Sequence, residues 1–589
     1  MWRVQYFSSK IKDLKNFDQL QTAVVPTSCS VSFELPMVAE NRSGGFRKHW
    51  QQVWSKEISW VVKPVIGEDG ALPLANRSTR VVAERYGGAG LGPNGGGVRC
   101  ANIDGVQIKG IGANLLAGCT TDRWHRHGAL STQDAVRELI WGEILHHALP
   151  YGAARGLALA STGTRYAVEI GAGKAPGWAP RALLARECVL RPAHFMRSIF
   201  YEPSEAARHL ASDTLRTREA WAAAHDCLLV ALDAACWTRT RPMEPDLGDC
   251  WLEVWRRAAA QLAAARTKRF MHGSLTPSNF SVDGRWLDFG TTTALGDNGR
   301  ALVAPGGVDM WRQEVPIHEA MNDLAFYAHK YLPAEQAQRA RTSEWREAFD
   351  CHLRDRTLLE FARRSGVPEP ILQRMDTPVR ERFAEAAARV ALEGAKKPYL
   401  YYGGGEHQMP ARSGRHDLAG AMRWLAWLPA EQNVYPLGTL RTWIADEVLA
   451  DELVQSLIAL RQAALRLSCA PLATQAMAIL AYQANLSLEG LWRLPFDLAV
   501  DSAARGDPER LGAFIEEFLA SWLPRVAAVE RSAVSLKGWL TRDAWLIDAE
   551  LRISRAGEDV RDLTALVSAL LLNGDDRKRA ANHLKTGLQ

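Results

Sequence analysis

The sequence predicts an α+β fold in which strands come first and helices later, with a large all-α region at the carboxyl end. Two short β-forming runs, 98–103 and 106–108, flank Asp104-Gly105, and this dipeptide between such runs predicts a tight antiparallel hairpin. From about residue 333 onward, Ala- and Leu-rich segments such as 455–467 have the apolar spacing of amphipathic helices.

The composition is that of an ordinary globular protein with several packed regions. The 589 residues exceed what one hydrophobic core usually supports, and 47% of them are apolar against 23% charged. The net charge of +5 is small for this length, and no basic stripe points to nucleic acid. The nine cysteines form no CxxC pair, and neither a signal peptide nor a membrane-spanning run is apparent. We therefore expect a cytoplasmic protein that binds neither nucleic acid nor membrane.

A capped helix follows the predicted hairpin. The segment from Ser131 to Asp134 has N-cap chemistry ahead of apolar residues at helical spacing, and Pro150 ends the pattern. Two further β-forming runs lie over 164–170 and 182–190, joined by a segment rich in Gly and Pro. Helical patterns such as 206–235 and 251–265 come next, so we expect the chain to turn strongly helical after residue 190, with one further short hairpin over 280–287.

The block from His272 to Gly290 carries the residues best suited to chemistry. Its first part reads His-Gly-Ser-Leu-Thr-Pro-Ser-Asn, and its last three residues are Asp288-Phe-Gly. An Asn on such a loop and the Asp of such a turn supply the oxygen ligands that Mg²⁺ prefers when it bridges the phosphates of a nucleotide. Asn279 and Asp288 are therefore the candidate metal ligands. We expect His272 to be structural and to hold the loop to the Asp288 turn.

A nucleotide site of the protein-kinase type also requires a Lys on a strand and a Glu on a helix that orients it. Lys109 ends the second strand of the predicted hairpin, and Glu138 lies in the second turn of the capped helix, so we predict an ion pair between them. Glu143 lies about 140° further around that helix and should point elsewhere. The predicted architecture is a protein-kinase-like bilobal fold with an all-α extension. Its regions are an irregular segment over 1–80, an N-lobe over 81–200, a C-lobe over 201–335 and helices over 336–589.

The order of these motifs resembles that of the selenoprotein O (SelO) family over about residues 80–330. Members of that family resemble kinases in fold, but they bind ATP in the reversed orientation and transfer AMP to protein hydroxyls. The matching segments are Tyr86-x-Gly88 with Gly92, Gly96-Gly-Val-Arg99, Ile108-Lys-Gly-Ile-Gly112, Val136-Arg-Glu138 with Glu143 and His146, His272 to Asn279, and Asp288-Phe-Gly290.

The resemblance implies a role for each matched residue. Gly96 and Gly97 would belong to the glycine-rich loop at the nucleotide, although the family has Gly-Asp-Gly-Arg where this chain has Gly-Gly-Val-Arg. The other implied roles are phosphate binding for Arg99 and Lys109, orientation of Lys109 for Glu138, and Mg²⁺ binding for Asn279 and Asp288. Arg191 and Arg197 stand near His194, where the family has two further phosphate-binding arginines at a different spacing.

Two serines depart from what an enzyme of this kind would have. Ser274 stands where ordinary kinase-like phosphotransferases have an acidic base, and Ser278 stands where the SelO family has an Asp. A hydroxyl of ordinary pKa accepts a proton poorly. Asp283, Asp288 or the substrate would therefore have to assist, or the site is slow or inactive.

Three functions stay open from the sequence. We expect an ATP- and Mg²⁺-dependent nucleotidyltransferase that transfers AMP to a hydroxyl of a protein or peptide. The alternatives are a kinase-fold phosphotransferase acting on a peptide or small molecule, and a pseudokinase scaffold that binds nucleotide. In each case we expect the helical region after residue 335 to be a surface on which a protein or peptide substrate docks.

Overall fold

The computed structural model is a mixed α+β structure, and this confirms the α+β part of the predicted fold class. Strands dominate before residue 190 and helices after it. The structure describes residues 20–24, 30–34, 68–69, 79–88, 90–103, 106–120, 127–168, 177–232, 245–296, 298, 300–302, 308–394, 398–400, 416–427, 437–505, 508–529, 533–537, 539–555, 558–560, 563–572 and 574–586.

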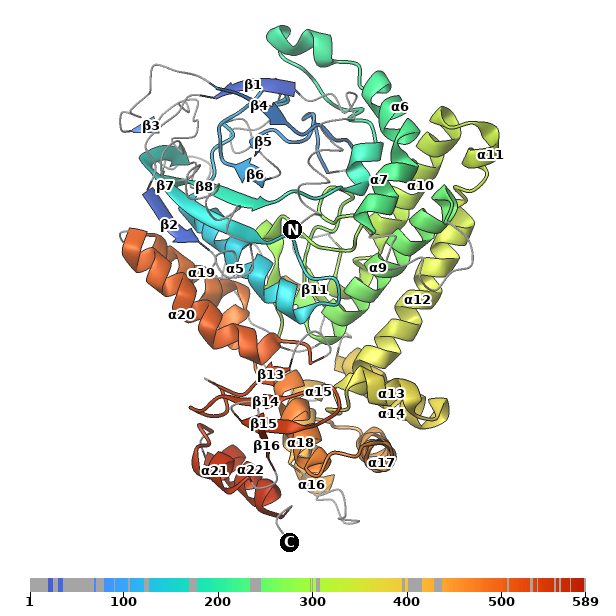
Figure 1. Cartoon of the computed structure of the whole chain (residues 1–589), viewed down its shortest axis with the longest axis vertical. Helices are drawn as coiled ribbons and strands as arrows, with labels where there is room; N and C mark the ends of the chain where they lie inside the picture. The colour runs from blue at the N-terminus through green and yellow to red at the C-terminus, as the bar shows by residue number, and fades with distance from the viewer. Residues whose placement is uncertain are drawn as a thin grey trace.

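An eight-stranded antiparallel sheet forms the amino-terminal part of the molecule (Figure 1). The strand order is β1-β4-β5-β6-β8-β7-β2, with β3 paired to β7. The segment 1–80, which the sequence predicted to be irregular, therefore supplies strands to this sheet. The strands are β1 (Leu20–Val24), β2 (Ser30–Glu34), β3 (Glu68–Asp69), β4 (Thr79–Ala83), β5 (Cys100–Ile103), β6 (Val106–Lys109), β7 (Gly156–Val168) and β8 (Gly177–Glu187).

The centre of the sheet has the register that brings the site residues together. Strands β5 and β6 pair with Ile103 opposite Val106, as the predicted hairpin requires, while Asp104 and Gly105 lie outside the described residues. On its other edge β6 pairs with β8, and Gln107 lies opposite Arg186. Because side chains two apart on a strand share one face, Gln107 and Lys109 point to the same side of the sheet.

Helix α5 (Thr132–Ala148) packs against β7 and β8, and its ends are those predicted. The Ser131 side chain accepts a hydrogen bond from the backbone N–H of Asp134, at 3.0 Å, and Leu149 caps the other end. Nearly every residue of α5 is buried, because α19 (Arg493–Ala504) and α20 (Pro508–Val526) cover the helix on the side away from the sheet (Figure 1). The carboxy-terminal half of the chain therefore completes the environment of α5.

The helices after the sheet are held together by a cluster of buried tryptophans. Ring centroids of Trp251 and Trp255 lie 5.7 Å apart, and Trp345 lies 5.8 Å from each of them. These rings join α9 to α12 across the predicted boundary at residue 335, which therefore does not divide the hydrophobic core. The helices of this part are α6 (Thr214–Ala222), α7 (Ala224–Ala231), α9 (Leu247–Thr267), α10 (Val315–Tyr331), α11 (Ala334–Ala337) and α12 (Thr342–Arg363).

The region 336–589 is not all-α as predicted. Strand β12 (Pro398–Leu400) pairs with β11 (Arg300–Leu302), and a four-stranded antiparallel sheet is formed by β13 (Val534–Ser535), β14 (Trp545–Ile547), β15 (Ile553–Arg555) and β16 (Glu558–Asp559). Strands of two or three residues are too short to leave an alternating apolar pattern in a sequence window. This sheet belongs to a second hydrophobic core, which runs from Phe361 to Leu584.

The remaining helices of this region surround that second core or join the first. None of the helices in the described part of the chain is long and apolar enough to cross a bilayer. The helices are α13 (Glu369–Arg374), α14 (Thr377–Gly394), α15 (Leu418–Ala426), α16 (Leu437–Leu440), α17 (Glu447–Leu467), α18 (Ala473–Ala484), α21 (Thr564–Ser568) and α22 (Gly574–Thr586), in addition to α19 and α20.

A buried ion pair fixes the segment that follows the sheet. The Arg216 guanidinium donates to both carboxylate oxygens of Asp213, at 2.7 and 2.9 Å, and also to the carbonyl oxygens of His194 and Met196. Arg85 lies 3.3 Å from the same carboxylate. The pair of Asp213 and Arg216 therefore ties the start of α6 to Arg85 and to the segment between the nucleotide-site candidates Arg191 and Arg197.

We predict that Asp213→Asn destabilises the protein by about 3–5 kcal/mol, because it leaves the guanidinium of Arg216 buried without its counter-charge. The measurement is the midpoint of urea unfolding. Asp226→Asn is the matched control, because Asp226 is exposed and its loss should leave the midpoint unchanged. Equal midpoints for the two variants would contradict the prediction.

Candidate functional site

The ends of the block from His272 to Gly290 are held together by a short strand pair. Strand β9 (Phe270–Met271) pairs with β10 (Thr293–Ala294), so the loop at 272–279 lies beside the turn at 288–290. The buried His272 ring bonds the carbonyl oxygen of Leu287 at 2.9 Å, and its edge packs against Trp286 and Phe289. His272 thus holds the loop to the turn, as expected for a structural residue.

The loop also fixes the side chain of Asn279. Its amide nitrogen donates to the carbonyl oxygen of Ser274 at 2.8 Å, and its amide oxygen accepts from the Ser278 hydroxyl at 3.2 Å. Its backbone carbonyl accepts from the N–H of Leu287 at 3.0 Å, immediately before the Asp288 turn. The amide oxygen therefore keeps one fixed direction at the base of the loop.

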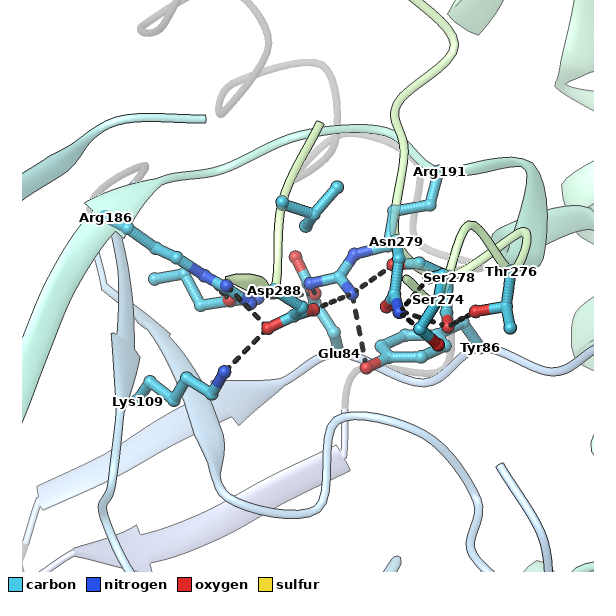
Figure 2. A network of polar contacts seen from close by, with 12 residues as sticks. Glu84, Tyr86, Lys109, Arg186, Arg191, Ser274, Thr276, Ser278, Asn279 and Asp288 are labelled. Carbon is cyan, nitrogen blue, oxygen red and sulfur yellow. Dashed lines mark hydrogen bonds and ion pairs between the residues drawn. The ribbon is translucent and has the colours of Figure 1, made fainter. Parts of the chain in front are cut away.

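Asp288 is the centre of the site, and three cations converge on its carboxylate (Figure 2). Lys109 Nζ lies 2.6 Å and Arg186 Nη1 2.8 Å from Oδ1, while Arg191 Nη1 lies 3.2 Å from Oδ2. Burial alone would raise the pKa of the Asp288 carboxyl, but Arg186, Lys109 and Arg191 outweigh it and hold the pKa well below its usual range. Asp288 is therefore a fixed anion.

The backbone of Asp288 is strained. Its φ and ψ are +63° and +68°, in the left-handed region that side-chain-bearing residues seldom occupy. Such a conformation costs of order 1 kcal/mol or more and persists only where the surroundings enforce it. Here the three ion pairs and the His272 bond to Leu287 supply that enforcement.

The expected ion pair between Lys109 and Glu138 is present. Lys109 Nζ contacts Glu138 Oε1, and the other Glu138 oxygen lies 3.3 Å from Arg186. Glu143 points away from this pair, as expected, and binds Arg155 through both carboxylate oxygens at 2.7 and 2.9 Å. Glu138 therefore orients two of the cations that contact Asp288.

Arg191 approaches Asp288 from the other side and is almost completely buried. Its Nη1 donates to the carbonyl oxygen of Ser278 at 2.7 Å, and its guanidinium lies over the Tyr86 ring, 4.7 Å from the centroid. Glu84 lies 3.7 Å from its Nη2. The predicted phosphate-binding role of Arg191 is therefore compatible with its position beside both the loop and the turn.

Two other predicted phosphate ligands lie elsewhere. Arg99 donates to the carbonyl oxygen of Ala129 at 3.3 Å, and Arg197 is close enough to Tyr327 of α10 for its charge to act on that hydroxyl. In the described part of the chain, neither arginine bonds to Asp288 or Asn279. The spacing of Arg197 from His194 differs from that in the SelO family, and this agrees with the position of Arg197 away from Asp288.

Gly96 and Gly97 are buried and serve to bring the chain close to the residues that follow β4. Their φ values are +77° and +57°, and a Cβ on Gly97 would stand 2.0 Å from the carbonyl oxygen of Glu84. A Cβ on Gly96 would stand 2.5 Å from that of Tyr86. Only glycine fits both the backbone angle and the close approach, so these glycines hold Glu84 and Tyr86 beside Arg191.

The candidates for a general base are engaged in other contacts. The Ser278 hydroxyl bonds Thr276 at 2.9 Å, and Asp283 accepts from Arg285 and Ser281. Although burial opposes it, the Arg285 charge holds the pKa of Asp283 below its usual value. Asp283 therefore stabilises the turn at 281–285.

Sequence reasoning missed Arg186, Gln107 and Glu84. Arg186 donates to Gln107 at 2.6 Å, and Gln107 donates to Glu84 at 2.6 Å, so these three side chains link Asp288 to β4. The sequence feature that could have identified Arg186 is its charge within the apolar run 182–190, because a cation on a central strand needs a partner. Its opposition to Gln107 on β6 could not be read without the register.

The positively and negatively charged side chains of the site are equal in number. Lys109, Arg186 and Arg191 face Glu84, Glu138 and Asp288. In the described part of the chain, no group of three or more His, Cys, Asp or Glu side chains has the arrangement of a metal site. The amide oxygen of Asn279 and the carboxylate of Asp288 nevertheless fit Mg²⁺, which commonly takes one or two protein oxygens and completes its shell with phosphates and water.

Comparison of the chain with protein-family models and with curated proteins finds no match.

We predict that His272→Leu destabilises the protein by about 1–3 kcal/mol at pH 7, because the buried carbonyl of Leu287 loses its partner. Burial lowers the pKa of His272 to about 4, so the folded protein keeps this ring neutral where an unfolded chain, with a His pKa of about 6.5, would protonate it. His272 therefore costs stability progressively as the pH falls from about 6.5 to about 4.

The measurement is the midpoint of thermal unfolding as a function of pH. His272→Leu should reduce the slope of the profile between pH 6.5 and 4, and part of the slope should remain because burial also lowers the pKa of His194 and of His583 to about 4. His209→Gln, at an exposed position, should keep the wild-type slope. A wild-type slope in His272→Leu would count against a buried neutral ring.

Proposed function

We propose that the chain is an ATP-dependent nucleotidyltransferase with a protein-kinase-like bilobal site, which transfers AMP to a hydroxyl of a protein or peptide. The observation that carries the proposal is the convergence of Lys109, Arg186 and Arg191 on Asp288. Three fixed cations beside a carboxylate and an Asn amide suit the phosphates of a nucleotide bound with Mg²⁺. This matches the order of SelO-like motifs in the sequence.

The cations are held ready for a ligand that carries several negative charges. Glu138 fixes Lys109 and Arg186, and Tyr86 and Ser278 fix Arg191, so little side-chain freedom remains to be lost on binding. Asn279 and Asp288 would hold Mg²⁺, which would supply charge neutralisation between the carboxylate and the phosphates. The three cations would then bind phosphate oxygens in place of the carboxylate.

The depth of the cations supports AMP transfer over phosphate transfer. The side chains of Arg186 and Arg191 are 4% and 1% exposed, whereas that of Asp288 is 22% exposed. The deepest positive charges match the terminal phosphates, where the negative charge of ATP is greatest. The α-phosphorus would then lie toward the open side, where a hydroxyl oxygen attacks it and pyrophosphate leaves with the electron pair of the broken O–P bond.

The engagement of the candidate bases in other contacts supports catalysis by positioning and electrostatics. The depressed pKa of Asp288 makes it a weak proton acceptor, and Asp283 is engaged by Arg285. The proton of the attacking hydroxyl would pass to the departing pyrophosphate or to water. Orientation and charge stabilisation supply most of the rate in transfers of this kind, so a missing base slows the reaction without abolishing it.

A second candidate is a nucleotide-binding scaffold, and the serines at 274 and 278 favour it. In either case we assign substrate or partner docking to the region after residue 335, and we expect the protein to act in the cytoplasm. A kinase-fold phosphotransferase that uses the same residues is the third outcome of the test below.

We predict that the protein incubated with Mg²⁺ and ATP incorporates label from the α-phosphate into its own hydroxyls or into an added protein, and none from the γ-phosphate. Asp288→Ala should abolish incorporation, and the exposed Asp226→Asn should retain it. Label from the γ-phosphate would assign a phosphotransferase instead. Measurable ATP binding without incorporation of either label would assign a scaffold.

We predict that Arg186→Met weakens ATP binding by roughly tenfold to a hundredfold and leaves adenosine binding unchanged, because only ATP presents phosphates to the guanidinium. The measurement is isothermal titration calorimetry with Mg²⁺ present. Arg208→Met is the matched control, since the Arg208 side chain is 75% exposed and outside the site. Equal loss of ATP and adenosine binding would show that the variant had damaged the fold instead.

A further inference from the structure

Helix α19 makes polar contacts with two separate parts of the Asp288 site. At its start, the Arg493 guanidinium donates through Nη1 to the carbonyl oxygen of Gly290 at 2.6 Å, beside the turn that carries Asp288. One helical turn later, Asp497 contacts Arg137 of α5, the helix that also carries Glu138. These contacts span 203 and 360 residues of sequence, so they join parts of the chain that local structure does not connect.

The two places are linked by one continuous series of charged contacts. Arg493 Nε lies 2.7 Å from Asp497 Oδ2, and Arg137 donates to Asp497 Oδ1 through Nη2 at 2.8 Å and Nε at 3.2 Å. Arg137 Nη1 also donates to Asp134 Oδ1 at 2.7 Å, and the hydroxyl of Ser131 donates to the other oxygen of Asp134 at 2.8 Å. The Asp497 carboxylate is therefore shared between the turn and the start of α5.

The two arginines of this series are shielded from water. The side chains of Arg137 and Arg493 are 8% and 10% exposed. Ion pairs at the open surface contribute little, because both ions stay solvated and mobile. Side chains at this depth have few other conformations available, so the series holds its two ends in one geometry.

Apolar packing would keep α19 on the fold without these charges. The Phe496 ring lies 5.7 Å from that of Trp141 on α5 and 5.6 Å from that of Phe518 on α20, measured between centroids. Loss of Arg493 would also leave Asp497 paired with Arg137. Attachment of the helix therefore does not explain why Arg493 reaches the turn.

The contact at Gly290 holds the outer side of the turn. Gly290 is exposed, and a Cβ added to it would meet no described atom within 4 Å beyond its chain neighbours. On the inner side, the hydroxyl of Thr291 donates to the carbonyl oxygen of His272 at 2.8 Å. The Arg493 bond thus completes the support of a turn whose strained backbone at Asp288 persists only where its surroundings enforce it.

We propose that Arg493 and Asp497 are positioning residues for the Asp288 site, which hold the Asp288 turn and helix α5 in fixed relative positions. This keeps the carboxylate of Asp288 aligned with Lys109, which Glu138 of α5 orients. The two residues act through the turn and the helix and are not ligands of the nucleotide. The effect on AMP transfer rests on the function proposed above, whereas the positioning itself can be tested on the protein without ligand.

The first test is hydrogen–deuterium exchange of the full chain, read by mass spectrometry over peptides that cover 131–138 and 285–293. Arg493→Met should speed exchange over 285–293 by roughly tenfold and leave 131–138 unchanged, because it removes a charge-assisted hydrogen bond to the turn alone. Asp497→Ala should speed exchange over both segments, because its carboxylate is shared between them. Arg505→Met is the matched control, since Arg505 is exposed at the end of α19, and it should exchange as the wild type does.

The second test is incorporation of label from the α-phosphate of ATP as the Mg²⁺ concentration is varied. Arg493→Met should lower kcat by roughly tenfold to a hundredfold and raise the Mg²⁺ concentration needed for half the maximal rate, because Asp288 is displaced. Adenosine binding and the thermal unfolding midpoint should stay close to those of the wild type. Arg493→Lys keeps the charge and one donor, so it should restore part of the rate.

The outcomes separate this inference from the proposed function. Faster exchange confined to the segments named for each variant supports it. Unchanged exchange over 285–293 in Arg493→Met overturns it whether or not the wild type transfers AMP, and faster exchange throughout the chain overturns it by showing general destabilisation. Where the wild type is active, an unchanged kcat and Mg²⁺ requirement in Arg493→Met also overturns it. A wild type without incorporation overturns the proposed function alone, and the exchange experiment then decides the positioning.

Discussion

The shared contact of Lys109, Arg186 and Arg191 with Asp288 is the interaction on which the site depends. Each cation comes from a different place, the end of β6, β8 and the segment after β8, and the carboxylate comes from a strained turn in the following part of the chain. Without the carboxylate, three buried cations would repel one another. The left-handed backbone at Asp288 would then lose the contacts that enforce it.

The carboxy-terminal half of the chain supports this arrangement directly. Arg493 of α19 donates to the carbonyl oxygen of Gly290 at 2.6 Å, next to the turn that carries Asp288. Asp497 of the same helix binds Arg137 at 2.8 Å, and Arg137 precedes Glu138 on α5. One helix therefore touches both the turn and the residue beside the one that orients Lys109. The region after residue 335 is thus part of the structure of the site as well as a candidate docking surface.

Sequence patterns predicted the parts of this site that depend on local chemistry. The N-cap at Ser131 and the β5–β6 hairpin follow from residue types at short spacing, and the pairing of Lys109 with Glu138 follows from the order of kinase-type motifs. Arg186 was missed because its role depends on the register between β6 and β8, which are far apart in the sequence. The small sheet β13–β16 was missed because its strands are too short for a periodic signal. Local motifs could therefore be predicted from the sequence, whereas the pairing of distant strands could not.

The balance of charges at the Asp288 site decides what it can bind. At Asp288, three carboxylates balance the three cations, so a polyanion must bring a cation of its own to occupy Asp288. This is the behaviour expected of a site for a nucleotide with Mg²⁺. Binding of a nucleotide at Asp288 should therefore depend on Mg²⁺.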